Sequence, residues 1–190
     1  MNKSLLKPRL NNGVAEFPVH HMRGGTSTGL VLWDEFLPEN LELREELLRH
    51  LMGVPLSGPL KGNRQITGLG RGTATSNKVF IVKGGRDDPT ILETTFAQLA
   101  SDHGNIDWSV NCGNMSSALP LWAADTGFIT VKPGEEVDAA ADRYGRCRLD
   151  EWMTIVLAEV STLRRNISPW NTDNQTRNKR SDALFVQVER

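Results

Sequence analysis

The sequence predicts an α+β domain rich in short strands, and three observations support this prediction. Glycines recur at short intervals through the first part of the chain. Between them lie short apolar or β-branched runs of the kind that form strands. Two longer segments instead carry helical patterns. With 190 residues the chain is long enough to bury a core of its own, in one domain or two small ones.

The first predicted strand and the first predicted helix follow one another closely. Residues 29–33 (Gly-Leu-Val-Leu-Trp) read as a buried strand. A helix is expected to begin at Asn40, and Gly53 and Pro55 are expected to end it. Its apolar positions share one face: Leu43, Leu47, Leu48 and Leu51.

Two further strands are predicted in the middle of the chain. Residues 78–83 form a β-branched run, and residues 94–100 alternate apolar with polar side chains. The segment 84–89 between them (Gly-Gly-Arg-Asp-Asp-Pro) has the composition of a turn. The two strands are therefore expected to form a hairpin.

A second helix is predicted over residues 113–125, where the side chains are small or apolar almost all round. Such a segment is typical of a helix buried on every side. Gly127 is its expected stop. Pro120 fits only in the first turn of this helix or at a kink, because proline lacks a backbone N–H.

The character of the chain changes after about Val131. Residues 133–190 contain fewer strand-like runs, a helical stretch at 149–164 and a polar stretch at 168–182 that reads as loop or disorder. We therefore expect a first domain over residues 1–132, followed by a divergent segment. That segment is either a truncated or frameshifted reading frame or a native divergent ending.

The composition argues against several classes of protein. The 22 basic and 23 acidic residues give a formal net charge of −1, which argues against a nucleic-acid-binding domain. No run approaches the ~20 apolar residues that cross a bilayer, and the first residues lack the apolar core of a secretory signal. A cytoplasmic location without membrane binding is expected. The two cysteines form no disulfide framework.

Two glycine-rich loops could bind an anion. The first, Met22-Arg-Gly-Gly-Thr-Ser-Thr-Gly29, places an arginine and two hydroxyls beside backbone N–H groups, which suits a carboxylate or a phosphate. The alternative is a tight turn before the strand. The second, Gly68-Leu-Gly-Arg-Gly-Thr-Ala-Thr-Ser76, matches neither a P-loop nor a dinucleotide fingerprint. Its alternative is a flexible hairpin loop.

Cys112 lies in Asn111-Cys-Gly-Asn-Met115, directly before the second predicted helix. A helix N-terminus favours the thiolate form, which makes a better base or nucleophile. The alternative is a small buried core cysteine. Cys147 lies in a charged stretch and reads as incidental, and the four histidines form no pattern that indicates a metal site.

Four motifs in order carry a family resemblance: Met22-Arg-Gly-Gly-Thr-Ser-Thr-Gly29, Gln65-Ile-Thr-Gly-Leu-Gly70, Ser76-Asn-Lys-Val79 and Asn111-Cys-Gly-Asn-Met115. Over about residues 19–131 the chain resembles the PrpF-like proteins. These are 2-methylaconitate isomerases and 4-oxalomesaconate tautomerases of the diaminopimelate-epimerase-like superfamily. The resemblance implies two similar domains, each a strongly curved sheet around a central buried helix, here 113–125. The active site would lie between the domains.

The resemblance also implies a chemistry without a cofactor or a metal. A proton is moved, with a double-bond shift, on a small unsaturated di- or tricarboxylic acid. Cys112 and Lys78 match the acid/base residues of the family. The expected substrate-binding residues are Arg23, Gly24, Gly25, Thr26, Ser27, Gly70, Gly72, Thr73, Ser76, Gly113 and Asn114.

Two departures from the family pattern leave alternatives open. Thr28 stands where many relatives carry lysine, and the family members are considerably longer than this chain. The first alternative is a non-catalytic carboxylate-binding or interaction domain. The second is a thiol-dependent hydrolase or transferase, which would need a histidine near Cys112. A missing second domain would also leave an apolar surface exposed, so we expect a homo-oligomer.

Overall fold

The computed structural model describes residues 7–72, 74–84 and 91–130, together with the backbone of four short strands that follow them. The elements of the main part, in chain order, are β1 (Arg9–Asn11), β2 (Val14–Glu16), β3 (His20–Gly24), β4 (Ser27–Trp33), the 3₁₀ turn η2 (Asp34–Phe36), α1 (Leu41–Met52), β5 (Lys78–Gly84), β6 (Ile91–Leu99), β7 (Ile106–Asp107), α2 (Gly113–Ser116) and α3 (Leu119–Asp125). The four later strands are β8 (Glu136–Asp138), β9 (Ala140–Ala141), β10 (Arg146–Arg148) and β11 (Thr154–Val156).

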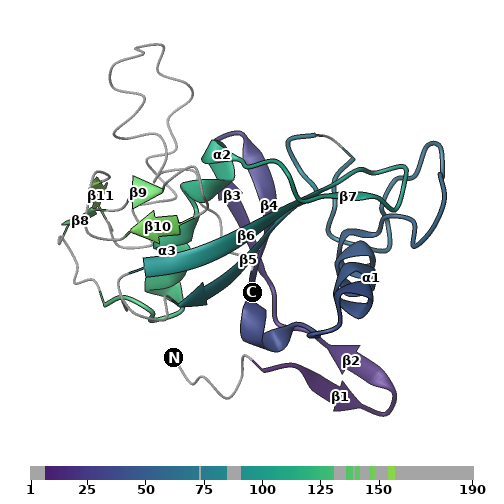
Figure 1. Ribbon diagram of the computed structural model, residues 1–190, viewed down its shortest axis with the longest axis horizontal. Helices are drawn as coiled ribbons and strands as arrows, with labels where there is room; N and C mark the ends of the chain where they lie inside the picture. The colour runs from purple at the N-terminus through teal and green to yellow at the C-terminus, as the bar shows by residue number, and fades with distance from the viewer. Residues whose placement is uncertain are drawn as a thin grey trace.

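A sheet forms the centre of the fold (Figure 1), and in the described part of the chain it has seven strands. Six of them follow the order β3-β4-β5-β6-β10-β9, and β7 pairs with β6. β4 and β5 are parallel, whereas β3–β4, β5–β6 and β6–β10 are antiparallel. The described fold is thus mixed α+β, and its sheet extends to strands beyond residue 132.

Helices cover both faces of this sheet (Figure 1). Side chains alternate in direction along the central strands, so each strand contributes apolar residues to both faces. One face packs against α2 and α3 through a core of Met22, Val31, Phe80, Val82, Leu92, Phe96, Met115, Ala118, Leu119, Trp122 and Ala123. The other face packs against α1 through Leu30, Leu32, Leu37, Leu48, Met52, Val54, Val79, Ile81, Ala97 and Leu99. The central strands β4 and β5 therefore carry apolar side chains at several successive positions, as the apolar and β-branched runs of the sequence predicted.

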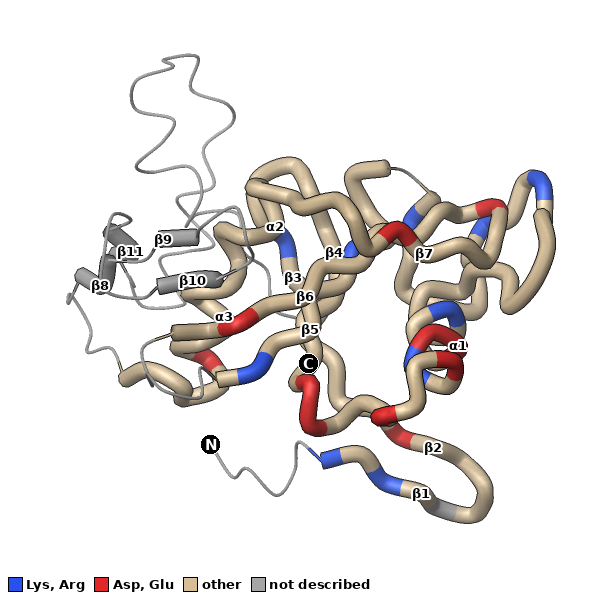
Figure 2. The backbone as a smooth tube through the Cα atoms, in the orientation of Figure 1, with Lys and Arg blue, Asp and Glu red and all other residues tan. Residues whose placement is uncertain are grey.

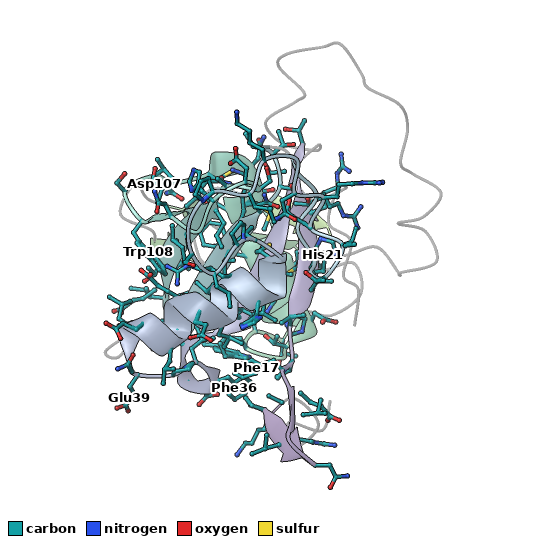
Figure 3. The ribbon with its side chains drawn as sticks, turned by 90° about the vertical axis from the view of Figure 1, so that its right-hand side faces the viewer. Phe17, His21, Phe36, Glu39, Asp107 and Trp108 are labelled. Carbon is teal, nitrogen blue, oxygen red and sulfur yellow. The ribbon has the colours of Figure 1, made fainter. Side chains whose placement is uncertain are left out.

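Helix α1 begins and ends where the sequence predicts. The side chain of Asn40 accepts a hydrogen bond from the Leu43 backbone N at 3.0 Å, and Gly53 ends the helix in the left-handed conformation. Leu48 and Met52 are buried, but Leu43 is 57% exposed, so the buried face is narrower than predicted. Figure 3 looks onto α1, with Trp108 on one side and Phe17 on the other. Figure 2 shows charged residues of both signs along this helix.

The second predicted helix is broken into two. α2 ends at Ser116 and α3 begins at Leu119, with Pro120 in its first turn. A proline in a continuous helix would leave one hydrogen bond unmade and clash with the carbonyl four residues earlier, here that of Ser116. The prediction of one helix over 113–125 is therefore wrong at this break, while the predicted restriction on Pro120 is confirmed. Trp122 and Ala123 are fully buried, as expected.

The predicted strands agree with the structure to within three residues at their starts, whereas the last predicted helix does not agree. β4 and β6 begin two and three residues before their predicted starts, and β5 agrees closely. The predicted helix at 149–164 is wrong at Thr154–Val156, which form β11 and pair with β8. Three successive β-branched side chains favour a strand there. Most of the predicted turn at 84–89 and the whole polar stretch at 168–182 lie outside the described residues.

Candidate active site

The two predicted acid/base residues lie on one face of the sheet, at one end. β4 begins at Ser27, and its parallel neighbour β5 begins at Lys78, opposite Gly29. Because paired residues point to the same face, Lys78 lies on the α2 side of the sheet, as does Phe80 two residues later. Cys112 precedes α2 on that same side, and its Sγ donates to Ser27 Oγ at 3.6 Å. Ser27 thus links the cysteine to the end of the sheet where Lys78 lies.

Cys112 is held at the start of α2 by backbone contacts. Its carbonyl oxygen accepts from the Ser116 N at 2.9 Å and from the Ser116 Oγ at 3.0 Å. The side chain is half-buried against the core on the α2 and α3 face. α2 is a single turn of four residues and is therefore much shorter than the helix that the sequence predicts after Cys112.

The segment leading to Cys112 is ordered by short-range side-chain hydrogen bonds. The Asp107 carboxylate accepts from the Ser109 Oγ at 2.6 Å and from the Ser109 N at 2.8 Å. These two bonds, the hydroxyl first, lower the pKa of Asp107 below its usual 3.8. The Asn111 side chain accepts from the Cys112 N at 2.7 Å. Such local bonds stabilise a turn in place of regular structure.

The turn between β3 and β4 packs directly against α2. A Cβ on Gly24 would lie 2.0 Å from the Asn114 carbonyl oxygen, so only glycine allows this approach. Gly25 has a φ of +53°, and the Asn114 Nδ2 donates to Thr26 Oγ1 at 2.8 Å. The structure therefore brings together a subset of the predicted site residues: Gly24, Gly25, Thr26, Ser27, Cys112, Gly113 and Asn114.

Lys78 is 8% exposed, which is unusual for a lysine. Its Nζ donates to the Oε1 of Gln98, the residue directly opposite on β6. The same nitrogen lies 5.5 Å from the centre of the Phe96 ring. The amine thus contacts a neutral oxygen and lies near an aromatic face.

The second glycine-rich loop is fixed by two buried amides. Gln65 Nε2 donates to the Met52 carbonyl at 2.8 Å and to Asn77 Oδ1 at 2.9 Å. The Gly72 N donates to Gln65 Oε1 at 2.6 Å, and the Arg71 N donates to Asn77 Oδ1 at 3.0 Å. Gln65 and Asn77 are each 2% exposed. The loop is consequently tied to the end of α1 and to the start of β5.

These internal bonds bear on the expected carboxylate contacts of the loop. The backbone N of Gly70 donates to the Met52 carbonyl at 3.2 Å, and the N of Gly72 is occupied by Gln65. Ser76 is 4% exposed, and its Oγ donates to Asn77 Oδ1 at 3.3 Å. These donors already have acceptors within the protein. Their hydrogen bonds therefore stabilise the loop, and the structure gives no direct support for their predicted role in binding a ligand. Thr73 lies outside the described residues.

Arg23 is not brought together with Cys112. Strand alternation places its side chain on the opposite face of β3 from Gly24 and Met22. Its Nε donates to the Gly25 carbonyl at 3.2 Å, and the residue is exposed. Its predicted contact with a substrate carboxylate stays a prediction.

Sequence reasoning missed the amides that hold the site together. Gln65 and Asn77 lie inside the quoted motifs, so their position in those motifs could have indicated a role. Gln98 lies 20 residues from Lys78, and only the strand register brings it opposite. No signal in the sequence marks such a pairing.

A hollow of about 430 Å³ lies at the other end of β5, away from Cys112 and Lys78. It is lined by Asp34, Arg44, Ile81, Lys83, Glu93, Thr94 and Thr95. The charges in it pair with one another, Arg44 with Asp34 at 2.8 Å and Lys83 with Glu93 at 2.9 Å. This pairing explains the charges without a ligand.

No group of three or more His, Cys, Asp or Glu side chains in the described part is placed to hold a metal ion. None of the described helices is long and apolar enough to span a membrane.

Comparison with known proteins identifies the family. The PrpF protein family matches residues 14–141. A 4-oxalomesaconate tautomerase of Pseudomonas putida is 32% identical over 119 residues, which are 63% of this chain and 31% of that protein. A 2-methyl-aconitate isomerase of Shewanella oneidensis is 31% identical over 136 residues, which are 70% of this chain and 32% of that protein. The matched part of this chain thus covers about a third of the length of each of these relatives.

A solved structure shows the same fold. The crystal structure of a methylitaconate-delta-isomerase aligns with a TM-score of 0.56 and 29% sequence identity. The alignment covers 68% of this chain and 55% of that one. Because the family match spans more than half of the chain and the fold agrees, this chain belongs to the PrpF family.

Proposed function

We propose that this chain carries the proton-transfer residues of an isomerase that shifts a double bond in a small unsaturated di- or tricarboxylic acid. The observation that carries the proposal is the placement of Lys78 and Cys112 on one face of the sheet, at one end. The similarity to relatives named as isomerases and a tautomerase of such acids supports it.

The reaction needs one base and one acid on the same substrate. One of Lys78 and Cys112 removes a proton from a carbon next to the activated double bond, and the electron pair spreads over the allylic system onto the conjugated carboxylate. The other residue returns a proton at the far end of that system. The double bond moves, no electrons are lost, and the two residues exchange protonation states. In this proposal the two side chains suffice without a cofactor.

Burial supports this chemistry. Ser27 and Lys78 are 3% and 8% exposed, so these two side chains are shielded from most water. Fixed donors stabilise developing charge better in such a site than in water. Next to Cys112 the space is open, since a Cβ on Gly113 would meet nothing within 4 Å. Asn114 and the turn at 24–27, which contact one another, are the proposed ligands of a substrate carboxylate.

The finer architecture belongs to the same proposal. α2 and α3 would serve as the central helix around which a strongly curved sheet wraps, in a first domain over residues 1–132. The site would then be closed by a second wall, supplied by another copy of the chain.

Variants at the two proposed catalytic residues test the function. With methylaconitate and oxalomesaconate as substrates, Lys78→Ala and Cys112→Ser are each expected to lower turnover by at least about a hundredfold, the usual contribution of a general acid or base. Lys83→Ala is the matched control, because Lys83 lies at the other end of β5 and pairs with Glu93. Its turnover should stay within about twofold of the wild type. Full turnover in Lys78→Ala or Cys112→Ser would exclude the assigned roles.

A further inference from the structure

Gln98 holds the amine of Lys78 with a neutral oxygen. The two residues are direct cross-strand partners, and the Lys78 Nζ donates to Gln98 Oε1. The same nitrogen lies 5.5 Å from the centre of the Phe96 ring. A lysine that is 8% exposed would ordinarily pair with a carboxylate, so the choice of an amide needs a reason.

The orientation of the Gln98 amide is fixed by the backbone. Its Nε2 donates to the carbonyls of Ser76 at 3.1 Å, Asn77 at 3.2 Å and Leu99 at 3.1 Å. Reversing the amide would turn its oxygen toward three carbonyl oxygens and its NH₂ group toward the lysine amine. The amide therefore has one satisfactory orientation, in which the oxygen faces Lys78.

A neutral acceptor and a carboxylate differ in how strongly they stabilise the protonated form of a lysine amine. A carboxylate within hydrogen-bond distance strongly favours the charged ammonium form of lysine, whereas an amide oxygen favours it less. An amide can thus hold the nitrogen in place while its proton remains transferable.

We propose that Gln98 is the positioning residue of Lys78, which fixes the amine through a neutral acceptor and so keeps it able to exchange a proton. The inference rests on the proposed function, since it explains how the proposed acid/base residue is prepared. Gln98 acts through Lys78 and is not assigned a contact with substrate.

The test compares two variants that act on the amine in opposite directions. The folded chain is treated with acetic anhydride at one pH, and the acylation rates of Lys78 and Lys83 are measured by mass spectrometry. Lys83 serves as the internal reference, since its amine pairs with Glu93 at the far end of the strand. Gln98→Glu should lower the Lys78 to Lys83 rate ratio by about tenfold, because a carboxylate stabilises the unreactive ammonium. Gln98→Met should raise the ratio, because the amine loses its acceptor.

Opposite changes in the two variants separate positioning from a structural role. Both variants remove the bonds from Nε2 to the backbone, so a purely structural role would move the ratio in the same direction in both. An unchanged ratio, or equal changes, would overturn the proposal. If circular dichroism shows that Gln98→Glu does not fold, Gln98→Met decides alone, and an unchanged ratio there overturns it.

The assay needs no substrate, so it distinguishes this inference from the proposed function. Opposite changes in Lys78 reactivity without any isomerase turnover would support the positioning role and contradict the function. Where turnover is measured, Gln98→Met should lower kcat by at least about tenfold through misplacement of the amine, with KM within about twofold.

Discussion

At the scale of single residues, small or neutral side chains determine how closely the parts of the site approach. Gly24 lets the β3–β4 turn contact the Asn114 carbonyl, which brings Ser27 next to Cys112. Gln98 presents an uncharged oxygen to Lys78. The geometry around Cys112 and Lys78 thus depends on residues that carry no charge.

Substitution of Gly24 tests this close approach. The Cβ of Gly24→Ala would lie 2.0 Å from a backbone oxygen, so α2 must move away. We expect a loss of about 2 kcal/mol in the free energy of unfolding, within the range for overpacking. Urea unfolding measures it. Gly113→Ala is the control, because its Cβ meets nothing within 4 Å. Equal stabilities for the two variants would show that the approach is unimportant.

At the scale of elements, the sequence predicted best where the signals were local. The cap at Asn40, the stop at Gly53 and the β-branched run of β5 each act within a few residues, and these elements are where the sequence placed them. The break between α2 and α3 follows from one proline whose effect depends on where the helix starts. β11 depends on pairing with β8, which lies 16 or more residues earlier in the chain.

In the candidate site, too, the sequence predicted what depends on local motifs and missed what depends on the folded structure. The motifs predicted the turn at 24–27 and Cys112, which the structure brings together. The sequence analysis did not place Arg23 on the other face, because it predicted no strand at residues 20–24, and side-chain alternation along β3 sets that direction. Nor could it predict that the backbone amides of Arg71 and Gly72 would already have acceptors, because the side chains of Asn77 and Gln65 reach them only in the folded loop.

The loop at 65–77 provides a prediction at this scale. Gln65→Leu removes the acceptor of the Gly72 N and a donor to Asn77, which in turn accepts from the Arg71 N. We expect the exchange of both backbone amides with deuterated water to accelerate by about tenfold, as for one lost buried hydrogen bond.

Hydrogen-exchange mass spectrometry or NMR measures these rates. Ile66→Ala is the matched control, because the neighbouring Ile66 is 86% exposed. Its exchange rates should match the wild type. Unaltered exchange at Gly72 in Gln65→Leu would mean that the loop is held by other contacts.

At the scale of the whole molecule, a sheet is covered by α1 on one face and by α2 and α3 on the other (Figure 1). Several apolar side chains nevertheless remain exposed on the segments that follow α1 and precede α2: Leu56, Leu60, Ile66, Leu69 and Val110. Exposed apolar surface of this kind favours association.

We therefore expect the chain to form an oligomer in solution. Multi-angle light scattering should give a mass of at least two chains. Ile66→Lys, which removes the most exposed of these side chains, should shift the population toward smaller species. A stable, monodisperse monomer at all concentrations would contradict the expectation.

The most direct test of the account is deuterium uptake by the substrate. The purified chain is incubated in deuterated water with methylaconitate and oxalomesaconate, and NMR follows deuterium incorporation and migration of the double bond. We expect incorporation of deuterium at the allylic carbon, and this incorporation should disappear in Cys112→Ser. Saturable shifts in the amides of Gly24, Gly25, Thr26 and Ser27 without any incorporation would contradict it, and would leave a domain that binds carboxylates without turning them over.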